Sequence, residues 1–97
     1  MDIRKLQKIA VAALEDIKGK DIEVINTTKL TALFDRLIIA SGDSTRQVKA
    51  LARNVADKVR EAGGTVYGME GEEGGEWVLV DLGDIVIHVM QPTIRAY

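Results

Sequence analysis

The order of apolar and polar residues predicts two amphipathic helices. The first begins after Asp2, a good N-cap, and Gly19 is expected to stop it. Its apolar face would carry Ile3, Leu6, Ile9, Ala10, Ala13, Leu14 and Ile17. The second helix opens at Ser44 and Gln47, which fit a capping box, and the glycines at 63–64 end it. Its inward face would carry Val48, Leu51, Ala52, Val55 and Val59.

Runs rich in β-branched residues predict five strands around these helices, at 21–26, 36–41, 65–69, 77–81 and 84–89. The run 37–40 is continuously apolar, as is typical of a strand buried on both faces. Residues 70–75 are too acidic and glycine-rich for a regular element, and a short helix is expected over 93–97 after Pro92. The order α-β-β-α-β-β-β predicts a single domain over 1–97 of the α/β (α+β) class, with a mixed five-stranded sheet and two main helices.

The last two predicted strands form a hairpin whose faces differ in character. With a two-residue turn at 82–83, Asp81 opposes Asp84 and Trp77 opposes His88. One face is then wholly aliphatic and must be core: Val78, Val80, Ile85, Ile87 and Val89. The other face is mixed: Trp77, Leu79, Asp81, Asp84, Val86 and His88. Because two helices are few for two sheet faces, we expect the mixed face to stay partly open for a partner.

Composition narrows the class of protein. The 97 residues contain no cysteine, which excludes disulfides, thiolate metal sites and cysteine nucleophiles. No apolar run has the length of a secretory signal or a membrane span, so we expect a soluble cytoplasmic protein that does not enter a membrane. Thirteen basic and 15 acidic residues give a net charge of −2, which argues against nucleic-acid binding that depends mainly on phosphate contacts. The charge favours a protein partner, particularly a basic one, and we expect no sequence-specific nucleic-acid partner.

Two groups of polar residues are candidates for a catalytic, metal or phosphate site. Asp81 and Asp84 form a carboxylate pair, but no His, Lys or third carboxylate stands near them in sequence, so solvated turn acids are favoured over a metal or catalytic pair. The segment 41–45 lacks the Gly-Lys of a phosphate-binding loop, and capping accounts for Ser44. We therefore expect no catalytic residue, no metal site and no cofactor.

Four further features could bear on function: the basic side of the second helix, Trp77, His88 and Leu82. The basic residues of the second helix, Arg46, Lys49, Arg53 and Arg60, are more typical of a solvated helix face than of an RNA contact. Trp77 is either a core aromatic or an interface anchor, and both interpretations stay open. His88 is expected to pack beside it rather than bind metal. Leu82, at the predicted hairpin tip, is expected to be free for a partner.

The final third of the chain also resembles a known family. The run 80–90 (VDLGDIVIHVM), preceded by MEGE at 69–72 and Glu76-Trp77, is similar to the signature of the Iojap/RsfS ribosomal silencing factors. Segments 13–18 and 39–52 extend the match in one register over nearly the whole chain. The resemblance implies a repressor of translation that binds large-subunit ribosomal protein L-fourteen and blocks joining of the small and large subunits. It also implies a link to large-subunit maturation, and a homodimer when the protein is free.

Within the matching motif, the resemblance places partner contacts at Trp77 and Leu82, with Asp81, Asp84 and Glu70 as polar neighbours. Family members usually continue past residue 97 into a further tail. The partner set expected from the resemblance therefore combines residues of the predicted hairpin with Glu70 of the loop before it.

The resemblance also implies a fold similar to that of nucleotidyltransferases. That chemistry needs two carboxylates at alternate strand positions facing bound metal. Here Val86 stands where the second carboxylate would follow Asp84, and Asp43 follows Gly42 where a serine is required. We therefore expect a nucleotidyltransferase-like fold without the catalytic carboxylates, and not an enzyme. The alternative is a divergent nucleotide-dependent transferase with metal near Asp81 and Asp84.

Overall fold

A computed structural model describes residues 1–96, which form one mixed sheet and three helices. The elements are α1 (Ile3–Asp16), β1 (Lys20–Asn26), β2 (Arg36–Ser41), α2 (Thr45–Glu61), β3 (Gly68–Glu70), β4 (Trp77–Asp81), β5 (Ile85–Met90) and α3 (Pro92–Arg95). The strand order is β1-β2-β5-β4-β3. Only β2 and β5 pair in parallel among these strands. The predicted class and strand number are confirmed, and so is a short C-terminal helix, although residue 97 lies outside the described residues.

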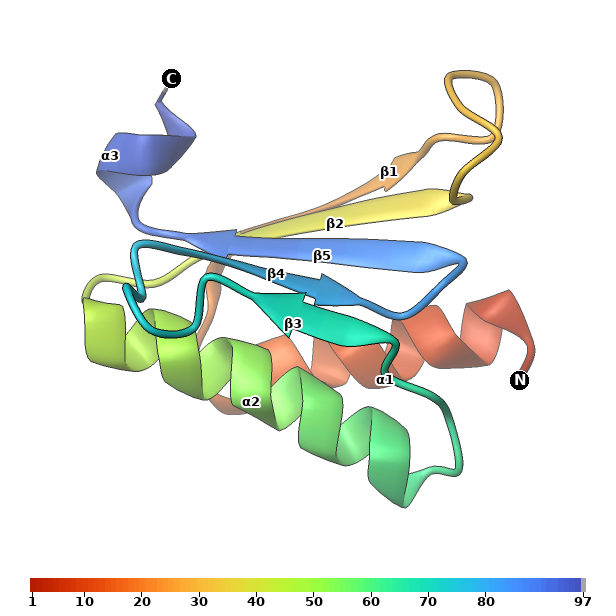
Figure 1. Ribbon diagram of the computed structural model, residues 1–97, viewed down its shortest axis with the longest axis horizontal. Helices are drawn as coiled ribbons and strands as arrows, with labels where there is room; N and C mark the ends of the chain where they lie inside the picture. The colour runs from red at the N-terminus through yellow and green to blue at the C-terminus, as the bar shows by residue number, and fades with distance from the viewer. Residues whose placement is uncertain (97) are drawn as a thin grey trace.

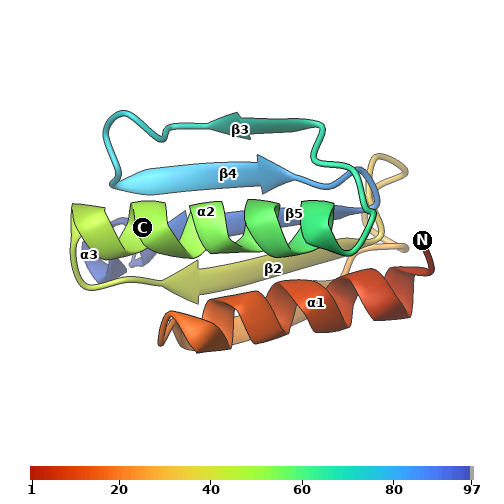
Figure 2. The same cartoon turned by 90° about the horizontal axis from the view of Figure 1, so that it is seen from below.

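Both long helices lie on the same face of the sheet (Figures 1 and 2). The core fills the space between them and the sheet. The aliphatic hairpin face predicted from the sequence is confirmed, since all five of its residues are completely buried: Val78, Val80, Ile85, Ile87 and Val89. A side-chain contact joins the two helices, because the Asn54 amide donates to the Ala13 carbonyl at 2.7 Å. Within residues 1–96, only α3 and the connection between β1 and β2 lie over the opposite sheet face (Figure 1).

The predicted N-caps are confirmed for both long helices. The Asp2 carboxylate accepts the Arg4 backbone N–H at 2.8 Å, and the Ser44 hydroxyl accepts that of Gln47 at 3.1 Å. In a capping box the Gln47 side chain would accept the backbone N–H of Ser44, but here it accepts that of Asp43, at 2.7 Å. The Gln47 amide nitrogen donates to the carbonyls of Ile17 and Lys18, just past the end of α1.

The two helices end differently. The chain leaves α2 through Gly63, with φ +87°, as predicted. The expected stop of α1 at Gly19 is wrong, because Lys18 takes the left-handed conformation instead, with φ +60°. Gly19 is needed for space: a Cβ there would lie 3.0 Å from the Leu14 carbonyl oxygen and 3.1 Å from the Leu51 side chain.

Two strand predictions need correction. The strand expected at 65–69 is shorter and extends one residue further, as Gly68–Glu70. Its pairing with β4 begins opposite Asp81, and residues 65–67 run past the end of that strand. The strand β2 is not buried on both faces. Ile38 and Ala40 are buried beneath the helices, whereas Leu37 and Ile39 stay partly exposed because no long helix covers their side.

The hairpin register differs from the prediction by two residues. Asp81 pairs with Val86 instead of Asp84, and the Leu82 N–H donates to the Ile85 carbonyl at 2.9 Å. The tip is therefore Gly83-Asp84, with Gly83 at φ +87°. A shift by two residues keeps every side chain on its face, so the predicted faces survive the wrong register.

Candidate functional site

The sheet face opposite the long helices carries most of the candidate site. Pairing places Trp77 and Leu79 of β4 on this side, next to His88 of β5. Further apolar residues continue across it onto the neighbouring strands: Val86, Ile39, Leu37 and Ile25. We call this surface the open face. The expectation that one face stays partly open is confirmed, and no long helix of the described chain lies on it (Figure 1).

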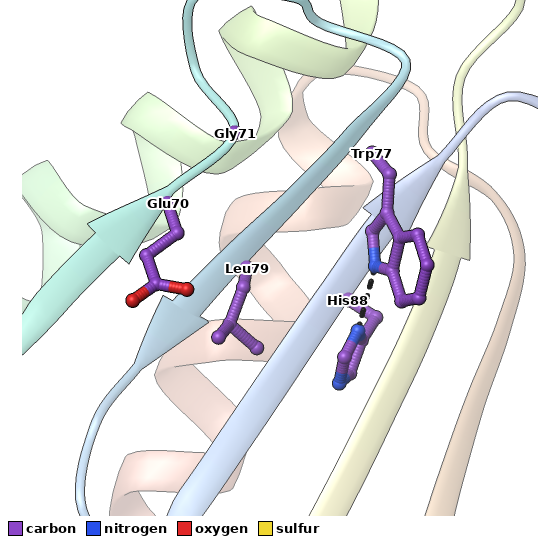
Figure 3. A pocket seen from close by; sticks show the side chains of 5 residues that line it. All are labelled: Glu70, Gly71, Trp77, Leu79 and His88. Carbon is purple, nitrogen blue, oxygen red and sulfur yellow. Dashed lines mark hydrogen bonds between the residues drawn. The ribbon is translucent and has the colours of Figure 1, made fainter.

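A shallow hollow lies on the open face near β3. It is lined by Glu70, Gly71, Trp77, Leu79 and His88 (Figure 3). The Trp77 side chain is 50% exposed, so the interpretation of Trp77 as a core aromatic is wrong. Leu79 and His88 are partly buried and form the floor, whereas Glu70 is exposed at the side. The hollow therefore combines apolar surface with one carboxylate.

Trp77 and His88 are joined by a hydrogen bond. The indole N–H of Trp77 donates to Nδ1 of His88 at 2.7 Å, and the ring centroids are 5.5 Å apart at an interplanar angle of 45°. The two residues are diagonal neighbours, since Trp77 pairs with Met90 and His88 with Leu79. Burial lowers the pKa of His88 below its ordinary value, which keeps the imidazole neutral at neutral pH.

Gly71 determines how the loop before β4 approaches the tryptophan. Its φ is +84°, and a Cβ at this position would lie 2.1 Å from the Trp77 carbonyl oxygen. The two backbones are thus in direct contact, and no other residue type fits without moving them. Nothing in the sequence distinguished Gly71 from the other glycines of its loop.

Glu70, the last residue of β3, lines the hollow, and the loop that follows carries three more glutamates. Glu70, Glu73 and Glu76 are exposed, and none of them takes part in an ion pair within residues 1–96. Glu72 differs, because its carboxylate pairs with Arg53 of α2 and ties the loop to that helix. One unpaired carboxylate in the hollow, with two more in the loop that leads to Trp77, gives this part of the surface a negative charge that favours a basic partner.

Leu82 does not lie where the sequence interpretation placed it. It is 4% exposed and belongs to the core, so its availability to a partner as a free hairpin tip is wrong. The cause is the register, which makes Gly83 and Asp84 the tip. Leu82 continues the alternation of Val78 and Val80 and therefore lies on the helix-covered face. That alternation is visible in the sequence and indicates a buried Leu82.

The two aspartates of the hairpin, Asp81 and Asp84, make different contacts. The Asp81 carboxylate accepts the Gly83 N–H at 2.8 Å, which is the hydrogen bond of an Asx-turn. Asp84 is exposed at the tip, and its backbone carbonyl accepts the N–H groups of Asp35 and Arg36. Neither carboxylate lines the hollow. In the described part of the chain, no group of three or more His, Asp or Glu side chains is placed to hold a metal ion.

Other elements border the open face. In α3, the Arg95 guanidinium donates to the Ser41 hydroxyl at 2.9 Å and to the Glu23 carboxylate at 3.0 Å, which fixes this short helix against β1 and β2. Leu30 and Leu33, in the connection between β1 and β2, are 77% and 84% exposed. Sequence reasoning missed both leucines, because that connection shows no periodicity.

No helix among residues 1–96 has the length and apolar character needed to cross a bilayer.

Comparison with known proteins finds relatives that match over the whole of this chain. Residues 1–97 match the family described as "Ribosomal silencing factor during starvation" (RsfS). The chain is 60% identical to the ribosomal silencing factor RsfS of Chromobacterium violaceum, over all of this chain and 80% of that protein. It is 39% identical to the RsfS of Bacillus subtilis, over all of this chain and 82% of that one. A crystal structure of a Chromobacterium violaceum protein, 60% identical, superposes with a TM-score of 0.98 over all of this chain and 81% of that one.

Proposed function

This chain belongs to the RsfS family of ribosomal silencing factors, and we propose that it represses translation by docking its open face on the large ribosomal subunit. The observation that carries the proposal is the half-exposed Trp77 on an uncovered apolar sheet face. A sheet face with this many apolar residues is the kind of surface that a protein partner covers.

The exposed part of Trp77 can supply a substantial share of the binding free energy. A tryptophan side chain buries up to about 250 Å² in a packed site, and half of that remains exposed here. Covering roughly 125 Å² at about 25 cal/mol per Å² gives about 3 kcal/mol. That value lies in the range of about 2–4 kcal/mol found for aromatic anchors of interfaces.

We further propose that the partner on the large subunit is ribosomal protein L-fourteen, as the family resemblance implies. The unpaired carboxylates of Glu70, Glu73 and Glu76 favour this kind of partner, because proteins that coat ribosomal RNA are generally basic. Occupation of that ribosomal surface would block an intersubunit contact by steric exclusion. The same docking would couple the protein to large-subunit maturation, and it places the site of action in the cytoplasm.

The proposed action needs no catalysis and no cofactor. In support, Asp81 uses its carboxylate to close its own turn, and Val86 stands where a second metal-facing carboxylate would follow Asp84. The alternative is a nucleotide-dependent transferase. Magnesium and nucleotide titrated against Trp77 fluorescence would then give a saturable change, accompanied by nucleotide transfer that Asp84→Asn removes.

We also propose that the free protein is a homodimer that covers part of the open face. Its support is the amount of apolar surface left by the monomer, including Trp77 and the partly exposed Leu37 and Ile39. Sedimentation of the protein over a range of concentrations tests the dimer, and a monomer at every concentration contradicts it.

The proposed function is tested by the joining of purified small and large subunits, followed by light scattering. Large subunits preincubated with the protein should form fewer joined ribosomes, and the isolated L-fourteen protein added in excess should restore joining. The order of addition provides the control, because steric exclusion predicts a weaker effect on ribosomes that are already joined. Normal joining at saturating protein would refute the proposal.

A further inference from the structure

We propose that His88 is a positioning residue for Trp77: the neutral imidazole, protonated on Nε2, holds the indole in the orientation used for docking. The inference rests on the proposed function of the open face and adds a conformational requirement to it. Its basis is the 2.7 Å hydrogen bond from the Trp77 indole N–H to Nδ1 of His88 (Figure 3).

The direction of this hydrogen bond determines the tautomer. Indole nitrogen is a donor only, so Nδ1 of His88 must offer a lone pair and cannot carry a proton. A neutral imidazole then has its proton on Nε2. An imidazolium ion carries protons on both nitrogens, so protonation of His88 removes the acceptor and ends the hydrogen bond to Trp77.

Trp77 needs such a contact because little else holds its ring. Half of the side chain is exposed, and its strand β4 fixes the backbone but not the side-chain torsions. An exposed side chain with several orientations must be ordered when a partner binds, which weakens binding by roughly two- to tenfold. A hydrogen bond already present in the free protein removes that cost.

The surroundings of His88 offer the imidazolium no compensation. Its neighbours in the sheet are apolar, with Leu79 on β4 and Ile39 on β2. Two carboxylates face the same side from nearby strands: Glu70 across the hollow and Asp81 further along β4. Neither forms an ion pair with His88, nor does any other group of the described residues.

Two further charged groups lie on this side beyond β2: Glu23 of β1 is in register with His88 through Ile39, and Arg95 of α3 donates to Ser41 of β2. The Arg95 guanidinium of α3 and the Glu23 carboxylate of β1 are paired with each other at 3.0 Å. Burial is accordingly the cause of the lowered pKa of His88. Since the folded pKa lies below the ordinary value of about 6.5, the hydrogen bond is complete at neutral pH and is lost as pH falls through the folded pKa.

The free protein gives the first test, and the chain suits it because it has one tryptophan and one histidine. Nitrogen-15 chemical shifts of the imidazole identify the tautomer, and the indole N–H resonance reports the hydrogen bond. The proposal predicts the Nε2–H tautomer, with an indole N–H that exchanges slowly with water until His88 is protonated. An Nδ1–H tautomer, or an indole resonance that does not respond to His88 protonation, overturns it.

Two variants give the second test in large-subunit binding. His88→Asn keeps an acceptor near the position of Nδ1 and does not titrate, whereas His88→Phe keeps a ring without an acceptor. At about pH 7.5, Asn should bind close to wild type and Phe roughly two- to tenfold more weakly. Lowering the pH below the folded pKa of His88, which the nitrogen-15 titration locates, should weaken wild-type binding and leave His88→Asn little changed.

Thermal melts of both variants separate positioning from folding. Equal binding by all three proteins, or a wild-type pH dependence that His88→Asn shares, overturns the inference. If the wild-type protein does not bind large subunits at any pH, the proposed function fails, and the nitrogen-15 measurement on the free protein still decides the Trp77–His88 coupling.

Discussion

Replacement of Leu82 by alanine should destabilise the fold strongly while leaving the docking surface intact. Leu82 is 4% exposed and packs in the core at the end of β4. Alanine removes three carbon atoms, which at about 0.8 kcal/mol each gives about 2.4 kcal/mol of lost transfer free energy. A residual cavity adds to this cost, but Leu82 borders a shallow hollow next to Leu6 and Tyr67 whose side chains can relax. The expected total is therefore roughly 2.5–3.5 kcal/mol.

Urea and thermal unfolding followed by circular dichroism measure this effect. For a chain of 97 residues, each kcal/mol shifts Tm by roughly 4–8 °C, so Leu82→Ala should melt roughly 10–25 °C below wild type. The matched control is Leu33→Ala, because Leu33 is 84% exposed and should change stability by less than about 0.5 kcal/mol. Well below its melting temperature, Leu82→Ala should bind large subunits like wild type. Equal melts of the two variants, together with a binding defect in Leu82→Ala alone, would refute the buried position.

Other substitutions test the remaining contacts of the hairpin region. Gly71→Ala should lower stability by more than about 1 kcal/mol in urea unfolding, because its Cβ would collide with the Trp77 carbonyl oxygen at a positive φ; an unchanged midpoint would contradict this close approach. Asp81→Ala should cost about 1 kcal/mol through the lost hydrogen bond to the Gly83 N–H, whereas Asp84→Ala, at the exposed tip, should change the midpoint very little. Equal costs for the two aspartates would show that the Asx-turn contributes nothing.

Strand alternation carried most of the sequence interpretation of the fold. It separated the buried Val78 and Val80 from the open-face Trp77 and Leu79, and this assignment survived a register error of two residues. The register itself was ambiguous, because Gly83 can supply the positive φ of a turn at either 82–83 or 83–84. The burial of Leu82 favours the second turn by about 2 kcal/mol, and only the position of the long helices shows that its side of the sheet is covered.

The site could be predicted only in part for the same reason. Of the residues that the family motif assigned to partner contact, Trp77 and Glu70 line one hollow, whereas Asp81 closes the turn and Leu82 packs in the core. The hydrogen bond to His88 depends on a diagonal neighbour relation that exists only in the correct register. Gly71 contacts the Trp77 backbone through the path of a loop, and no local periodicity encodes such a path.

The most direct test of docking through the open face is the affinity of purified large subunits for two variants. Trp77→Ala removes the exposed aromatic of the open face, and Tyr67→Ala removes one that is 69% exposed and lies by the Leu82 hollow on the helix-covered side. Both should stay folded, since a half-exposed tryptophan costs less than the roughly 3–5 kcal/mol of a buried one. Docking through the open face predicts that Trp77→Ala loses roughly thirty-fold to nearly a thousand-fold in affinity while Tyr67→Ala binds like wild type. Unchanged binding by a folded Trp77→Ala protein, or an equal loss in both variants, would contradict it.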